Sequence, residues 1–235
     1  MSAQAKHRAT SLHTHEPPFD TVRLREALSL FLNQKVPEHG RLGSCQHGLY
    51  AFFDYDGEPI YVGQTVEQLG TRIRRHLTNQ RTDAVAMGVL DPFEVRTVKV
   101  WPLWPDIITQ LNKGTIRNLL DSLEAELFEK LLAESRFQAL LNEKPAPVRK
   151  GKPVKLPDAF SADLVAEDVA ALREHPDVRL ARRATAIAKL AQIISERKVS
   201  RQLRRVLVAQ AKRLTWLAEE RAKTFVHASD EIEGD

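Results

Sequence analysis

Two phenols, a guanidinium, an imidazole and a carboxylate are spaced along this sequence so that folding could bring them together. They belong to Tyr50, Tyr61, Arg72, His76 and Glu124. Groups of these types can transfer protons, bind an oxyanion and hold a divalent cation when they converge on one point. Their chemistry therefore depends on the elements that carry them.

The two tyrosines stand in a segment that predicts a β-hairpin. The apolar runs GLYAFF (48–53) and PIYVG (59–63) are separated by Asp56-Gly57, a strong turn signal. In an antiparallel pair, opposing residues have a constant index sum and side chains alternate between faces. A two-residue turn in either of its two placements puts Tyr50 and Tyr61 on one face, whereas a three-residue loop would separate them.

Glycines mark the outer ends of both strands. Gly48 and Gly63 would let another backbone or a phosphate approach closely. Taken alone, however, the hairpin is more typical of ordinary cross-strand aromatic packing.

The following segment, 69–78, predicts an arginine-rich helix. Arg72 and His76 are four residues apart and share one face, while Arg74 and Arg75 lie on other sides. Such a pair is usually surface decoration. Its position directly after Tyr-Val-Gly-Gln-Thr makes it a candidate for the same site.

A carboxylate interrupts the apolar stripe of a long helix predicted over about 115–134. The stripe consists of Leu120, Leu127 and Leu131, and Glu124 falls inside it. A carboxylate there costs on the order of several kcal/mol unless it is paired or binds a metal. A salt bridge to an arginine of the preceding helix is the structural alternative, and Glu126, at the polar edge, is the competing acid.

Together these motifs resemble the GIY-YIG nuclease superfamily. The resemblance rests on Gly48-Leu49-Tyr50, Tyr61-Val62-Gly63, Arg72-x-x-x-His76, Glu124 and Asn142, in this order and spacing. The segment FDTVRLREALSLFLNQ before the hairpin resembles the restriction-endonuclease branch of that superfamily, which cuts palindromic DNA as a dimer.

The resemblance implies hydrolysis of a phosphodiester by water with one divalent metal ion. The metal would be Mg²⁺, with Mn²⁺ able to substitute, and Glu124 would be its ligand. Tyr50 would be the general base or would orient the attacking water, although a free phenol with a pKa near 10 must be assisted at neutral pH. Tyr61 would hydrogen-bond the water or the phosphate.

The remaining motif residues have supporting roles in the same scheme. Arg72 would bind a phosphoryl oxygen. His76 would relay the proton or donate to the phosphate, and the sequence leaves both open. Asn142 would orient the active-site glutamate or the backbone around it.

Candidate DNA contacts lie in and beyond this core. We assign Gln64, Arg74, Arg75, Lys150, Lys152, Arg204 and Arg205 to this role. The segment from Arg179 to Arg213 contains eleven Lys or Arg and one acid, Glu196. Such a segment suits phosphate contacts, but a solvated helix surface explains it equally well.

The elements predict an α+β fold: a small three-stranded antiparallel sheet flanked by helices, with an α-helical C-terminal extension. Beyond Ser161 the pattern is helical throughout. The expected divisions are a disordered N-terminus (1–18), a lead-in helix (19–43), a nuclease core (44–142), a basic proline-rich linker (143–160), a basic helical extension (161–227) and an acidic tail (228–235).

Composition is that of a globular protein in a reducing compartment. Hydrophobic residues make up 43% of the chain and charged residues 28%, and the single cysteine, Cys45, excludes an internal disulfide. No apolar run is long enough for a membrane span, and the N-terminus lacks the apolar region of a signal peptide. We expect a cytoplasmic protein with double-stranded DNA as its partner, a homodimer as its candidate assembly, and no organic cofactor.

Two other functions compete with restriction-type cleavage. One is a repair, mobile-element or phage-defence nuclease that acts on structured or foreign DNA. The other is a catalytically inactive DNA-binding or assembly protein that retains the fold.

Overall fold

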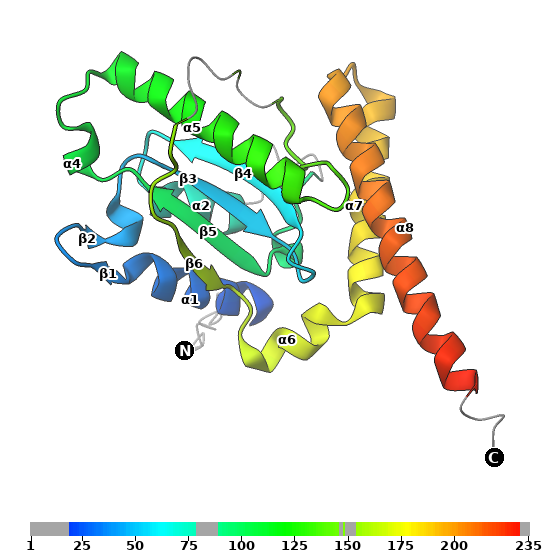
Figure 1. Ribbon diagram of the computed structural model, residues 1–235. Helices are drawn as coiled ribbons and strands as arrows, with labels where there is room; N and C mark the ends of the chain where they lie inside the picture. Colours follow the sequence, from blue (N-terminus) through cyan, green and yellow to red (C-terminus); the bar gives the residue numbers. More distant parts are fainter. Residues whose placement is uncertain (1–18, 79–88, 146–147, 149–153, 231–235) are drawn as a thin grey trace, which may run out of the picture.

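The computed structural model describes residues 19–78, 89–145, 148 and 154–230, with side chains up to residue 224 (Figure 1). In chain order the elements are α1 (Phe19–Asn33), β1 (Lys35–Val36), β2 (Gly40–Arg41), the 3-10 turn η1 (Leu42–Ser44), β3 (Gly48–Phe53), β4 (Pro59–Thr65), α2 (Leu69–Thr78), η2 (Pro92–Glu94), β5 (Thr97–Pro102), α4 (Pro105–Ile108), α5 (Lys113–Glu134), β6 (Phe160–Asp163), α6 (Glu167–Glu174), α7 (Pro176–Glu196) and α8 (Arg201–Asp230). The N-terminal segment 1–18 and the candidate DNA contacts Lys150 and Lys152 lie outside the described residues.

An antiparallel sheet with strand order β4-β3-β5-β6 forms the centre of the fold. The predicted α+β class is confirmed, but the sheet has one strand more than expected. β6 pairs with β5, with Ala162 opposite Val98. The sequence predicts helix beyond Ser161 because a four-residue strand is too short to reveal a period of two, and its hydrogen-bond partners come from β5.

A 3-10 turn precedes the third strand of the sheet. Pro92–Glu94 forms this turn, and β5 starts at Thr97. The Asp91 side chain accepts a hydrogen bond from the Phe93 backbone N–H at 2.9 Å, so it caps this turn.

Helices cover both faces of the sheet (Figure 1). α5 covers one face, where its leucines pack on Leu49, Ala51 and Val62. On the other face, Tyr50 and Phe52 share a core with residues of α1, α2, α7 and α8. Because alternate residues of β3 enter different cores, the hairpin separates its tyrosines from the α5 face.

The C-terminal helices α7 and α8 run antiparallel against one end of the sheet (Figure 1). Leu190 of α7 and Leu203 and Val206 of α8 are buried in the same hydrophobic cluster as Tyr50. The extension expected over 161–227 therefore packs directly on the core expected over 44–142.

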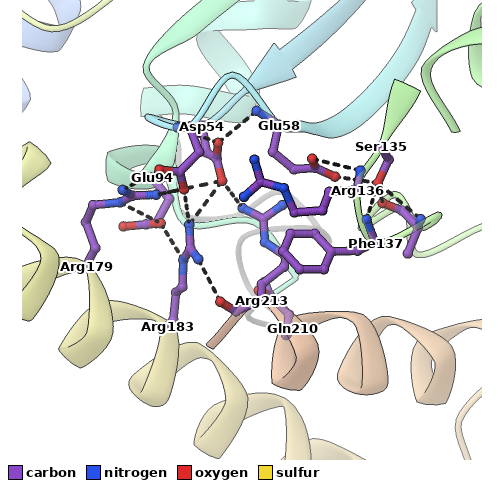
Figure 2. Close-up of polar contacts among 12 residues, drawn as sticks. Asp54, Glu58, Glu94, Ser135, Arg136, Phe137, Arg179, Arg183, Gln210 and Arg213 are labelled. Atoms are coloured by element: carbon purple, nitrogen blue, oxygen red, sulfur yellow. Dashed lines mark hydrogen bonds and ion pairs between the residues drawn. The ribbon is translucent and has the colours of Figure 1, made fainter. Parts of the chain in front are cut away.

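Buried ion pairs also join α7 and α8 to the core, as Figure 2 shows. Asp54, which follows β3, accepts hydrogen bonds from Arg183 at 3.0 Å and from Arg213 at 2.6 Å. Glu94 accepts from Arg183 at 3.0 Å, and Arg179 pairs with Asp56. All of these arginines are buried, so their charges are matched by acids of the core and are withdrawn from any external polyanion.

Candidate active site

The hairpin places both tyrosines on one face by a route that the sequence did not reveal. Asp54 N–H donates to Glu58 O at 3.0 Å, which leaves a three-residue turn with Gly57 at φ +70°. That turn alone would put Tyr61 on the face opposite Tyr50. A β-bulge between Phe52 and Phe53 shifts the register, so that Phe52 faces Tyr61 and Tyr50 faces Gly63.

Tyr50 lies across Gly63. A Cβ on Gly63 would overlap the hydroxyl and ring of Tyr50, so only glycine leaves room for the phenol. The rings of Tyr50 and Tyr61 are stacked with centroids 6.4 Å apart. Gly48 has a different purpose: a Cβ there would collide with the carbonyl of Trp101 in the neighbouring strand.

Helix α2 supplies the two groups that contact the Tyr50 hydroxyl. Arg72 Nε donates to Tyr50 Oη at 3.2 Å, and His76 Nε2 is 2.9 Å from the same oxygen. The His76 ring is buried, and its Nδ1 has no hydrogen-bond partner among the described residues. The predicted i, i+4 pair therefore converges on one phenol.

Burial sets the protonation of this cluster. It raises the pKa of Tyr50 to about 12, against the opposing effect of the Arg72 charge. Burial, together with the charges of Arg72 and Arg75, lowers the pKa of His76 to about 3. At neutral pH Tyr50 is a phenol and His76 is a neutral imidazole, so the phenol can donate its hydrogen bond to His76 Nε2.

Glu124 of α5 is the acid whose charge acts on this cluster. Burial raises its pKa to about 7, while a hydrogen bond from Gln64 opposes the rise. Its charge also raises the pKa of Tyr50 and of Tyr61. Glu126 lies about 200° further around the helix, on the other side from Glu124.

The acid environment of Glu124 suits a divalent cation. Its carboxylate is half-buried and its anion is destabilised, and Asp121 and Glu143 add to the negative potential there. A cation would relieve all three effects. The described residues contain no group of three His, Cys, Asp or Glu side chains arranged around a metal. Mg²⁺ keeps several waters and needs only one or two protein carboxylates, so the residues present fit it.

Asn142 is positioned away from the phenols. Its Oδ1 accepts from Val62 N–H at 3.2 Å and its Nδ2 donates to Val62 O at 2.6 Å. It thereby satisfies the free edge of β4, next to Leu141, whose N–H donates to Ile60 O. That Asn142 orients the active-site glutamate or the backbone around it stays a prediction.

A cleft of about 240 Å³ opens beside the cluster between α2 and α5. It is lined by Gln64, Thr65, Val66, Glu67, Arg72 and Arg117. Gln64 donates to Asp121 at 2.6 Å. Arg75, expected to contact DNA, forms a bidentate pair with Glu67 at 2.7 and 2.8 Å, and Arg74 is half-buried.

Three residues of the site were not found from the sequence. Asp121 is three residues before Glu124 on one helix, and helical spacing could have indicated it. Arg117 is a further turn away along the same helix. Glu143 accepts from Tyr61 Oη at 3.4 Å, a contact that depends on the path of the loop after α5.

Comparison with known families finds a match in the part of the chain that carries this site. The family model of the GIY-YIG catalytic domain matches residues 46–133. The match includes β3, β4, α2, β5 and α5, and thus Tyr50 through Glu124, whereas Asn142 and the C-terminal helices lie outside it. No curated protein and no solved structure matches the chain.

Residues 46–133 are therefore similar to the GIY-YIG catalytic domain, and this similarity indicates a nuclease. The predicted resemblance to the superfamily is confirmed at this level. Among the described residues, no helix has the length and apolar character needed to cross a membrane.

Proposed function

We propose that this protein is a Mg²⁺-dependent endonuclease that hydrolyses phosphodiester bonds of double-stranded DNA. The observation that carries the proposal is the buried Tyr50 hydroxyl, held between Arg72 Nε at 3.2 Å and His76 Nε2 at 2.9 Å within the field of Glu124. A phenol needed only for packing has no reason to be hydrogen-bonded to both an imidazole and a guanidinium within the field of a desolvated acid.

Tyr50 is best suited to a proton relay. A phenol with a pKa of about 12 is protonated at neutral pH and is not by itself a base. It can take a proton from the attacking water only while its own proton moves to His76 Nε2. The water oxygen then forms the new P–O bond as the bond to the leaving oxygen breaks, and protonated His76, with a pKa of about 3, readily returns the proton.

Arg72 and Glu124 would stabilise charge in the same step. The guanidinium of Arg72 lines the cleft and reaches the phenol, so it can bind a non-bridging phosphoryl oxygen while orienting Tyr50. Glu124 would hold Mg²⁺, which when bound stabilises negative charge on the phosphate and leaving oxygens. Mn²⁺, another cation that suits carboxylate ligands, would substitute.

We further propose restriction-type, sequence-specific cleavage by a homodimer, and a cytoplasmic location. The first rests on the resemblance of residues 19–34 to the restriction-endonuclease branch. These residues form α1, which packs against α2 of the nuclease domain. The location rests on Cys45, which is buried and not in a disulfide.

Incubation of unmodified plasmid with the protein and Mg²⁺ tests these proposals, with Glu124→Gln as the control. Discrete fragments whose sequenced ends share one motif support restriction-type cleavage. Cutting of flaps or junctions in preference to plasmid would replace it with a repair or defence role. Absence of metal-dependent cleavage of every DNA form would make the protein a non-catalytic DNA-binding protein.

A further inference from the structure

The basic residues of α7 and α8 fall into two groups that the sequence could not separate. Arg179, Arg183 and Arg213 point inward and pair with acids of the core. The second group surrounds the turn between the helices: Arg197, Lys198, Arg201, Arg204 and Arg205, which we name the turn surface. Every member of the turn surface is exposed, and none forms an ion pair or hydrogen bond through its side chain with a described residue.

The turn surface is uniformly positive. No acid interrupts residues 197–205. On α8, Arg201, Arg204 and Arg205 fall within an arc of about 100°. The opposite face of the helix carries Leu203, Val206 and Ala209, all buried. The N-terminal end of α8 therefore packs its apolar face against the core and exposes its basic face to solvent.

A chain of contacts fixes the turn surface beside the active site. Gln202, between Arg201 and Leu203, donates through Nε2 to Asn142 O at 3.1 Å. The Asn142 side chain holds the backbone of Val62, and the adjacent Glu143 accepts from Tyr61 Oη. Only the Asn142–Glu143 segment thus separates the turn from the phenols.

We infer that the turn surface binds the phosphate backbone of duplex DNA next to the bond that is cut. Unpaired guanidinium groups on a rigid helix release counterions from a polyanion at little entropic cost. A substrate in the cleft beside Arg72 must extend past the residues that line it, and the Gln202–Asn142 contact links the turn surface to the segment that hydrogen-bonds Tyr61. The inference rests on the proposed function in taking DNA as the polyanion, and it extends the expected contacts Arg204 and Arg205 to a surface that includes Arg197, Lys198 and Arg201.

The test compares two triple variants with equal loss of charge. The first is Arg201→Gln, Arg204→Gln and Arg205→Gln. The matched control is Arg25→Gln, Lys35→Gln and Arg41→Gln, three exposed residues of α1, β1 and β2, away from the α7–α8 end (Figure 1). Binding of a random-sequence duplex is measured without divalent metal across a salt series, and thermal unfolding confirms that each variant is folded.

The turn triple is expected to lower the slope of log K against log[salt] by about 2.7, since each phosphate contact contributes about 0.9. Between about 50 and 200 mM salt, the wild type should then weaken about 40-fold more than the triple variant. The control triple should keep the wild-type slope. Replacement of the same three arginines by lysine should also keep it, because counterion release depends on charge.

The possible results separate this inference from the proposed function. The inference is overturned if the turn triple variant keeps the wild-type slope, or if the turn and control triple variants lower the slope equally. This holds even if the wild type cleaves DNA. If the turn triple variant lowers the slope of log K against log[salt] but the wild type cleaves no DNA, the nuclease proposal is overturned and the DNA-binding surface is retained. A wild type that does not bind duplex DNA overturns the turn surface as a DNA contact.

Discussion

At the scale of single residues, Glu124 has a measurable energetic signature. Its pKa of about 7 lies above the ordinary 4.5, so the folded state holds the proton more tightly than the unfolded chain. The contribution of Glu124 to stability is therefore most favourable below pH 4.5 and is lost as pH rises toward 7. Above pH 7 the carboxylate destabilises the fold until a cation binds.

We predict that Glu124→Gln stabilises the metal-free protein at pH 8 by about 1–3 kcal/mol and has little effect at pH 4. Mg²⁺ should raise the melting temperature of the wild type at pH 8 but not that of the variant. Thermal unfolding at both pH values, with and without Mg²⁺, measures this. Equal stabilisation of both proteins by Mg²⁺ would show that the metal binds elsewhere.

Gly63 makes a second residue-scale prediction. Gly63→Ala should displace the Tyr50 phenol, reduce cleavage at least 100-fold and destabilise the fold by about 1–3 kcal/mol. In a double-mutant cycle with Tyr50→Ala, the stability losses should be far from additive because the two changes share one clash. Additive losses would mean that the phenol does not lie over Gly63.

At the scale of elements, the turn of the hairpin shows what sequence patterns can and cannot predict. Alternation identifies both strands and places Tyr50 and Tyr61 on one face, as observed. The three-residue turn and the bulge at Ile60 each move Tyr61 to the opposite face of the sheet, so their two effects cancel. Neither is visible from Asp56-Gly57, because the bulge depends on pairing across β3 and on Leu141, which hydrogen-bonds the Ile60 carbonyl.

The spacing of charged residues predicts which side chains share a helix face, but it does not predict which acids pair with the arginines. The α2 spacing correctly brings Arg72 and His76 together on one phenol. The excess of arginine after residue 179 does not reveal that Arg183 and Arg213 are buried on Asp54, because that acid is more than a hundred residues away in sequence. Long-range pairing of this kind is set by the packing of α7 and α8.

The Asp54 network gives the prediction at this scale. Asp54→Asn should destabilise the protein by about 3–5 kcal/mol, because it removes the anion that pairs with the buried Arg213 and one of the anions that pair with the buried Arg183. The exposed pair Arg23–Asp168 supplies the control: Asp168→Asn should cost less than about 1 kcal/mol. Urea unfolding measures both, and similar small losses would mean that the network is solvated.

At the scale of the whole molecule, α7 and α8 complete the core around the hairpin that carries Tyr50 and Tyr61. They bury Leu190, Leu203 and Val206 against the face that carries Tyr50. The family match ends at residue 133, yet the side chains that support the site continue to Arg213. The segment that matches the family is therefore shorter than the unit that packs around one core.

Removal of residues 167–235 is accordingly predicted to leave a chain without cooperative thermal unfolding. The truncation exposes the apolar core and removes the arginines that pair with Asp54 and Glu94. Near-ultraviolet circular dichroism and calorimetry of the truncated chain measure this. A soluble 1–166 fragment that melts cooperatively and cuts DNA would show that the nuclease domain folds alone.

The single-turnover cleavage rate of Tyr50→Phe measures whether the Tyr50 hydroxyl transfers the proton of the attacking water. Phenylalanine keeps the ring over Gly63 and removes only the oxygen bound by Arg72 and His76. Cleavage should fall by about 10²–10⁴ while the affinity for duplex DNA stays at the wild-type value. Cleavage by this variant at the wild-type rate would mean that the Tyr50 hydroxyl transfers no proton in the reaction.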